Sequence, residues 1–204
     1  GNTCDRFCKG YKDNPSTEEM LAQAVKIPFV EGIELVGTWD IRPDNVKDMK
    51  KRMEDYGKAC VSIIPDVFTV KEYGKGSLTS TDPAVRKDTL DYLRKMSEIA
   101  HEMNSGVVNL WLGQDGYDYL LTADYNQERE WLTEGTSKLA TEFPGMKFAL
   151  EYKPKEPRNF SYHARMADTI LAAKETGCKN VGVCIDTGHS FMAGENAAEA
   201  VVLA

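Results

Sequence analysis

The sequence lacks the features of several large protein classes. Its 204 residues contain no apolar run as long as a membrane-spanning helix and no recognisable signal peptide. Positively charged residues are also fewer than negatively charged ones: the chain has 25 Lys and Arg and 32 Asp and Glu, which gives a net charge of −7. Nucleic-acid binders usually carry a basic patch. We therefore expect neither a membrane nor a nucleic acid as partner.

Cysteine is sparse and scattered. The five cysteines show no zinc-binding spacing, and their odd number gives no disulfide framework. This usage is typical of a reducing compartment, so a cytoplasmic protein is expected. Cys60 and Cys184 lie in apolar, strand-like runs and are expected to be small core residues. Surface or packing roles are expected for Cys4 and Cys8.

Short apolar runs alternate with segments of helical periodicity along the whole chain. This alternation predicts parallel strands joined by crossover helices. Helix-start signals support it: Ser16 with Glu19 three residues on, and Asp82 followed by Pro83. The expected strands are 32–37, 60–65, 107–113, 148–153 and 181–186, and the expected helices are 16–26, 42–57, 83–104, 126–143, 162–176 and one from 196 onward.

The pattern favours an α/β fold of the (β/α)₈ TIM-barrel class. No glycine-rich dinucleotide fingerprint follows any expected strand, so a Rossmann fold has no support. A complete barrel needs eight strands and about 250 residues. The five strands are interpreted as strands two to six of an incomplete barrel. Residues 1–204 are thus expected to form a single domain truncated at one or both ends.

Polar side chains gather where the expected strands end, which is where active sites of such barrels lie. Glu151 and Lys153 alternate on one face, Asp186 ends the next strand, and His189 follows it. Two carboxylates and an imidazole suit Mn²⁺, Mg²⁺ or Co²⁺. The alternative is a salt bridge from Lys153 to either carboxylate, with His189 capping a turn. The residues alone leave both open.

Two motifs resemble those of sugar isomerases. The segment from Glu151 to Arg158 closely resembles the E-x-K-P-x-E-P-R segment of xylose isomerases. The segment from Asp186 to Asn196 resembles their following strand, with an acid, then G-H, then M-A-G-x-N. Xylose isomerases carry Glu in place of Asp186, and the D-T-G-H form is more similar to L-rhamnose isomerases. Trp111, followed by Gly113 and Gly116, resembles the tryptophan that walls the sugar site.

The resemblance implies a xylose isomerase-like TIM-barrel domain that interconverts an aldose and a ketose by a metal-assisted hydride shift between C1 and C2. It implies that Glu151 and Asp186 bind a first divalent metal and His189 a second. Lys153 would bind the carbonyl oxygen, so Glu151 and Lys153 are the implied catalytic residues. The implied substrate is a monosaccharide bound by Trp111, Lys153, His189 and Phe68, and the implied assembly is a homo-oligomer, either a dimer or a tetramer.

Other functions on this fold remain open from the sequence. A ketose 3-epimerase would use two metal-bound glutamates and would not need Lys153, and a barrel could also bind a sugar without catalysis. Abasic-site endonucleases use a histidine-rich zinc site, which three histidines and the acidic charge disfavour. Asp40, Asp66 and Asp115 lie at the site end of the strands and could serve the site or be turn or cap residues. Phe191 is a further candidate for lining the pocket, beside Phe68. His101 is expected at the surface or in the core, and His163 is expected to be an exposed helix residue.

Overall fold

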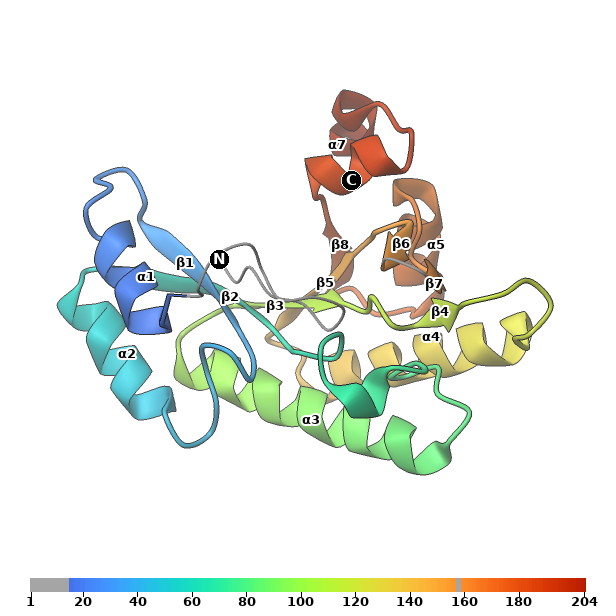
Figure 1. The fold of residues 1–204 in the computed structure, drawn as a ribbon, viewed down its shortest axis with the longest axis horizontal. Helices are drawn as coiled ribbons and strands as arrows, with labels where there is room; N and C mark the ends of the chain where they lie inside the picture. Colours follow the sequence, from blue (N-terminus) through green and yellow to red (C-terminus); the bar gives the residue numbers. More distant parts are fainter. Residues whose placement is uncertain (1–14, 157–158) are drawn as a thin grey trace.

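Five parallel strands form the central sheet, in the order β1-β2-β3-β5-β8 (Figure 1). A computed structural model describes residues 15–156 and 159–204 of the chain. The strand bounds are β1 (Gly32–Val36), β2 (Ala59–Ile64), β3 (Val107–Trp111), β5 (Lys147–Glu151) and β8 (Val181–Cys184). Sequence order and spatial order coincide along the sheet, as in a barrel wall. The five expected strands are confirmed, with ends that differ by one or two residues.

Crossover helices connect the strands, and α2, α3 and α4 lie along one side of the sheet (Figure 1). The helix bounds are α1 (Thr17–Ala24), α2 (Val46–Asp55), α3 (Pro83–Glu102), α4 (Tyr125–Glu142) and α5 (Met166–Glu175). The core forms between these helices and the sheet. On β5, for example, Phe148 and Leu150 are fully buried, whereas Ala149 and Glu151 on the other face are only partly buried. The inner face therefore remains accessible at the site described below.

The helix-start signals of the sequence are borne out. Ser16 and Glu19 form a reciprocal capping box at α1, and the Asp82 carboxylate accepts a hydrogen bond from the Ala84 amide at α3. Asn196 caps the last helix, α7 (Ala197–Leu203). Two helix starts were predicted about one turn too early: the helix expected from residue 42 begins at Val46, and the helix expected from residue 162 begins at Met166. A short helix that directly follows β8, α6 (Thr187–Met192), was not expected.

A second, antiparallel sheet lies beyond the carboxyl ends of β3 and β5. Its strands are β4 (Gly116–Tyr117), β6 (Lys155–Glu156) and β7 (Asn159–Ser161), in the order β4-β7-β6. Gly116 lies so close to Phe160 that an added Cβ would be 1.8 Å from the Phe160 carbonyl oxygen. Stacking of Tyr117 on Phe160, with centroids 5.4 Å apart, joins the two segments. This sheet fixes the segment after Glu151, which was expected to be a loop.

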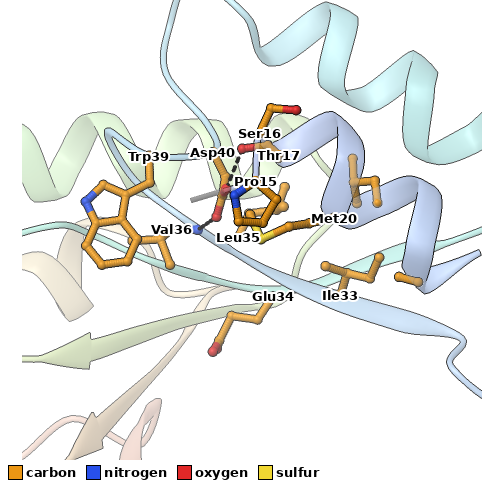
Figure 2. Close-up of a pocket in the computed structure, with 12 residues that line it drawn as sticks. Pro15, Ser16, Thr17, Met20, Ile33, Glu34, Leu35, Val36, Trp39 and Asp40 are labelled. Atoms are coloured by element: carbon orange, nitrogen blue, oxygen red, sulfur yellow. Dashed lines mark hydrogen bonds between the residues drawn. The ribbon is translucent and has the colours of Figure 1, made fainter. Parts of the chain in front are cut away.

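A cavity of about 560 Å³ lies between α1 and β1 (Figure 2). Its lining is mostly apolar, and the Asp40 carboxylate at its rim accepts hydrogen bonds from Thr17 Oγ1 and the Val36 amide. Figure 2 shows Glu34 pointing away from it, across the strand. The cavity is thus on the helix side of β1, and its lining includes Trp39, which lies just beyond the strand. In the described part of the chain, no helix is both long and apolar enough to span a membrane.

Candidate metal centre and sugar site

The carboxyl ends of β5 and β8 bring three potential metal ligands together. Glu151 ends β5 and is paired in register with Cys184, the last residue of β8. Asp186 follows as the N-cap of α6, and its Oδ1 accepts a hydrogen bond from the His189 amide at 3.0 Å. This cap turns the short helix so that His189 lies beside Glu151. One ligand atom from each of the three side chains lies within 4.8 Å of the others.

The imidazole of His189 lies between the two carboxylates without being hydrogen-bonded to either. Its Nδ1 is 3.4 Å from Glu151 Oε1, and its Nε2 is 3.6 Å from Asp186 Oδ2. Nδ1 is buried and has no hydrogen-bond partner within the described residues. A buried polar atom normally has one. The spare nitrogen and the converging oxygens are the donor set that a divalent cation accepts, so these residues fit a metal.

The electrostatics of the site also suit a cation. Burial raises the pKa of Glu151, the neighbouring Asp186 charge raises it further, and a hydrogen bond from the Asn109 amide to Glu151 Oε2 at 2.7 Å opposes both. Burial lowers the pKa of His189, which keeps the imidazole neutral. Neutral imidazole is the form that binds metals. A divalent cation would relieve the repulsion between the two acids.

Lys153 lies next to this cluster, but its ion pair is with a residue that the sequence analysis did not single out. Its Nζ pairs with Glu156, and neither Glu151 nor Asp186 forms a salt bridge with it among the described residues. The ammonium also lies 5.1 Å from the centroid of the Trp111 ring. The salt bridge from Lys153 to Glu151 or Asp186 that the sequence left open is therefore not the arrangement observed in the part of the chain that the structure describes.

Three rings form an aromatic wall beside the metal cluster: Trp39, Phe68 and Trp111. The Phe68 ring centroid is 4.2 Å from that of Trp111 and 5.8 Å from that of Trp39. The His189 ring also stacks against Trp111, with centroids 6.4 Å apart. Phe68 and Trp111 were predicted to contact the sugar, whereas Trp39 was not, although its position just beyond β1, at the same end of the sheet, pointed to it.

Three further aspartates at strand ends hold loops. Asp66 and Asp115 are fully buried and accept several hydrogen bonds each, and Asp40 ties β1 to α1. Phe191 is 71% exposed and does not share the packing of the aromatic wall. The expectation for His163 was wrong: it is only 6% exposed, because it precedes α5 instead of lying on a helix surface.

The cysteines and the remaining histidine fall in different environments. His101 is on the exposed side of α3. Cys60 is buried in the core as expected, whereas Cys184 is only partly buried, on the inner face beside Glu151. Predictions for Cys4 and Cys8, and the Pro157-Arg158 end of the first motif, lie outside the described residues.

A family model described as the xylose isomerase-like TIM barrel matches residues 20–204. The chain belongs to this family. Among curated relatives, the xylose isomerase of Thermus thermophilus is 27% identical over 169 residues, covering 80% of this chain and 43% of the relative. That of Salmonella paratyphi A is 29% identical over 134 residues, covering 63% and 32%. The chain thus spans less than half the length of these relatives.

Several solved structures share the fold of this chain. The D-psicose 3-epimerase of Clostridium cellulolyticum superposes with a TM-score of 0.74 at 17% identity, covering 93% of this chain and 64% of that chain. The 3-keto-D-glucoside 4-epimerase of E. coli gives 0.74 at 15% identity, covering 95% and 72%. The sheet described above is accordingly part of a TIM-barrel wall, as expected from the alternation of strands and helices.

Proposed function

We propose that this chain carries the metal-binding part of a divalent-metal-dependent aldose–ketose isomerase. The observation that carries the proposal is the convergence of Glu151, Asp186 and His189 at the carboxyl ends of β5 and β8, beside Lys153. The sequence similarity to xylose isomerases supports it. The acidic net charge of −7 favours an unphosphorylated monosaccharide as substrate.

Glu151, Asp186 and His189 would hold the cation, and Mn²⁺, Mg²⁺ and Co²⁺ suit this oxygen-rich set. The three donors converge closely enough to serve one ion. The division of ligands between two ions, with His189 on the second, stays a prediction. When bound, such a cation acts as a Lewis acid on the sugar oxygens.

Lys153 is the proposed electrostatic catalyst. Its ammonium would donate a hydrogen bond to the sugar carbonyl oxygen and stabilise negative charge as hydrogen moves between C1 and C2. Glu156 restrains the ammonium group of Lys153. The ammonium also contacts the Trp111 ring, which places it at the edge of the aromatic wall. Trp111 and Phe68 offer an apolar surface to the C–H face of the sugar, and His189 closes the site beside Trp111.

The test compares two neighbouring lysines in the full-length protein. Lys153→Met should leave Mn²⁺ affinity nearly unchanged and lower kcat by roughly 100- to 1,000-fold, as expected when a transition-state hydrogen-bond donor is lost. Lys155→Met is the matched control. The Lys155 ammonium lies over the Phe160 ring, 4.1 Å from its centroid, whereas the Lys153 ammonium lies by Trp111. Full activity in Lys153→Met, or an equal loss in both variants, would refute the role of Lys153.

Isotope labelling separates the proposal from the two other functions on this fold. Turnover in D₂O should leave C3 unlabelled and retain the transferred hydrogen between C1 and C2. Deuterium at C3 would instead identify a ketose 3-epimerase. Sugar binding without any turnover would identify a non-catalytic barrel. The homo-oligomeric state and the cytoplasmic location also stay predictions.

A further inference from the structure

Asp66 links the two loops that carry the aromatic wall. It lies just beyond β2 and is 0% exposed. Its Oδ1 accepts hydrogen bonds from the amides of Phe68 at 3.4 Å and Thr69 at 2.9 Å. Its Oδ2 accepts hydrogen bonds from two hydroxyl groups, Thr38 Oγ1 and Thr69 Oγ1. One buried carboxylate thus holds the β1–α2 loop against the segment that follows β2.

The residues bound to Asp66 lead directly to two of the three rings. Trp39 Nε1 donates a hydrogen bond at 3.3 Å to Thr69 Oγ1, the same hydroxyl that donates to Asp66. The backbone of Phe68 is held from both sides, by Asp66 at its amide and by Gln114 Nε2 at its carbonyl oxygen, 3.1 Å away. The chain Asp66–Thr69–Trp39 therefore orients the indole through side-chain contacts alone.

The backbone at Thr38 is strained, and contacts with its neighbours hold it in that conformation. Thr38 has a φ of +63°, a left-handed conformation that a β-branched residue rarely adopts. The hydroxyl bond to Asp66, and a bond from Arg42 Nη1 to the Thr38 carbonyl oxygen at 3.3 Å, hold it there. Strain of this kind persists only where the surroundings fix it, and it clusters at functional sites. Here it sets the chain direction one residue before Trp39.

Asp115 is a second buried aspartate, and it holds a loop that has no hydrogen bond to the aromatic wall among the described residues. Asp115 is also 0% exposed and accepts hydrogen bonds from the amides of Ser77 and Thr79 at 3.1 and 2.7 Å, and from both hydroxyl groups. Neither Ser77 nor Thr79 contacts a ring of the aromatic wall through a described hydrogen bond. Asp115 is therefore a matched control for burial and hydrogen bonding.

We propose that Asp66 is a positioning residue for sugar binding, which holds Trp39 and Phe68 in line with Trp111, and that Trp39 extends the sugar-contacting surface beyond Trp111. The proposal rests on the proposed function. A rigid aromatic surface contacts the C–H face of the sugar equally in the ground state and the transition state. Its loss should therefore raise KM and leave kcat nearly unchanged.

Asp66→Asn tests this, because the amide oxygen can keep both backbone hydrogen bonds, while the NH₂ group replaces the charged acceptor of both hydroxyls with a neutral donor and leaves their O–H groups without that partner. We expect KM for the preferred aldose to rise roughly tenfold and kcat to change less than about twofold. Asp115→Asn should lower the melting temperature and leave KM within about twofold of wild type. Equal KM changes in the two variants, or an unchanged KM in Asp66→Asn, would overturn the proposal.

Two further variants apply if Asp66→Asn does not fold. Thr69→Val removes the hydroxyl that joins Asp66 to Trp39 at constant shape and should raise KM, whereas Thr69→Ser keeps the hydroxyl and should restore it. Near-UV circular dichroism provides a readout without turnover. The Trp39 band, defined by difference from Trp39→Phe, should change in Thr69→Val and persist in Thr69→Ser and Asp115→Asn. An unchanged Trp39 band in Thr69→Val refutes the positioning role, whereas absence of sugar turnover in wild type refutes the proposed function.

Discussion

Asn109 should control metal affinity through Glu151 without binding metal itself. It is 3% exposed on β3, and its amide donates a hydrogen bond to Glu151 Oε2 at 2.7 Å. A buried hydrogen bond to a charged group contributes about 1.5–3 kcal/mol. Asn109→Leu has nearly the same shape and removes this bond, so the Kd for Mn²⁺ should rise roughly 10- to 150-fold.

Removing the bond should also change the pH dependence of metal binding. The Asn109 hydrogen bond lowers the pKa of Glu151 against the dominant effect of burial, so its loss should raise that pKa further. In Asn109→Leu, Glu151 should then stay protonated up to a higher pH, and Mn²⁺ must displace that proton in order to bind. The difference in Mn²⁺ affinity between the variant and wild type should therefore grow as pH falls. Calorimetric titration with Mn²⁺ at several pH values measures both effects.

Asn180→Ala is the control for a general loss of stability. The Asn180 side chain donates to the carbonyl oxygens of Ala140, Phe143 and Met146, on the helix side of the sheet. This variant should unfold more easily and bind Mn²⁺ as wild type does. If Asn109→Leu bound Mn²⁺ with unchanged affinity, Glu151 would not be a metal ligand in the way proposed.

Two further predictions concern stability. Burial is the largest cause that lowers the pKa of His163 from 6.5 to about 4. Between these two pH values the unfolded chain therefore binds a proton more readily than the folded chain. The free energy of unfolding should accordingly fall by roughly 3 kcal/mol as pH drops from 6.5 to about 4. His163→Leu should remove this part of the pH dependence in denaturant unfolding, whereas His101→Gln on the exposed side of α3 should keep it; an identical pH profile in His163→Leu would show the reasoning to be wrong. Gly116→Ala would place a Cβ 1.8 Å from the Phe160 carbonyl oxygen. It should lower the free energy of unfolding by about 1–3 kcal/mol and weaken hydrogen-exchange protection in β4 and β7. The control is Gly145→Ala, whose added Cβ meets no atom within 4 Å and should leave stability nearly unchanged. Equal stability of the two glycine variants would argue against the β4–β7 pairing.

Local patterns were sufficient to predict the central sheet and to bring Glu151, Asp186 and His189 to the same end of it. Alternation along β5 separated Phe148 and Leu150 from Glu151, and parallel strands necessarily bring their carboxyl ends to one edge. The position of Asp186 after β8 then placed His189 near Glu151. The caps at Ser16 and Asp82 depend on neighbours in sequence, and they too were predictable.

Features that depend on contacts between distant segments were not predictable in this way. The β4-β7-β6 sheet pairs strands of two or three residues, too short for a periodic signal, and the close approach of Gly116 to Phe160 is a tertiary contact. That sheet turns the chain so that Lys153 meets Glu156 instead of Glu151. The burial of His163 likewise follows from the packing of the segment before α5, not from its helix-like sequence.

Binding of a divalent cation by Glu151, Asp186 and His189 can be measured directly by titrating the full-length protein with Mn²⁺ and following the electron paramagnetic resonance signal of free Mn²⁺. Wild type should bind Mn²⁺, while Glu151→Gln, Asp186→Asn and His189→Gln should each weaken binding by at least about tenfold. Glu142→Gln, which removes a surface partner of Arg94, should bind as wild type does. Wild-type affinity in all three site variants would show that these side chains do not bind the cation.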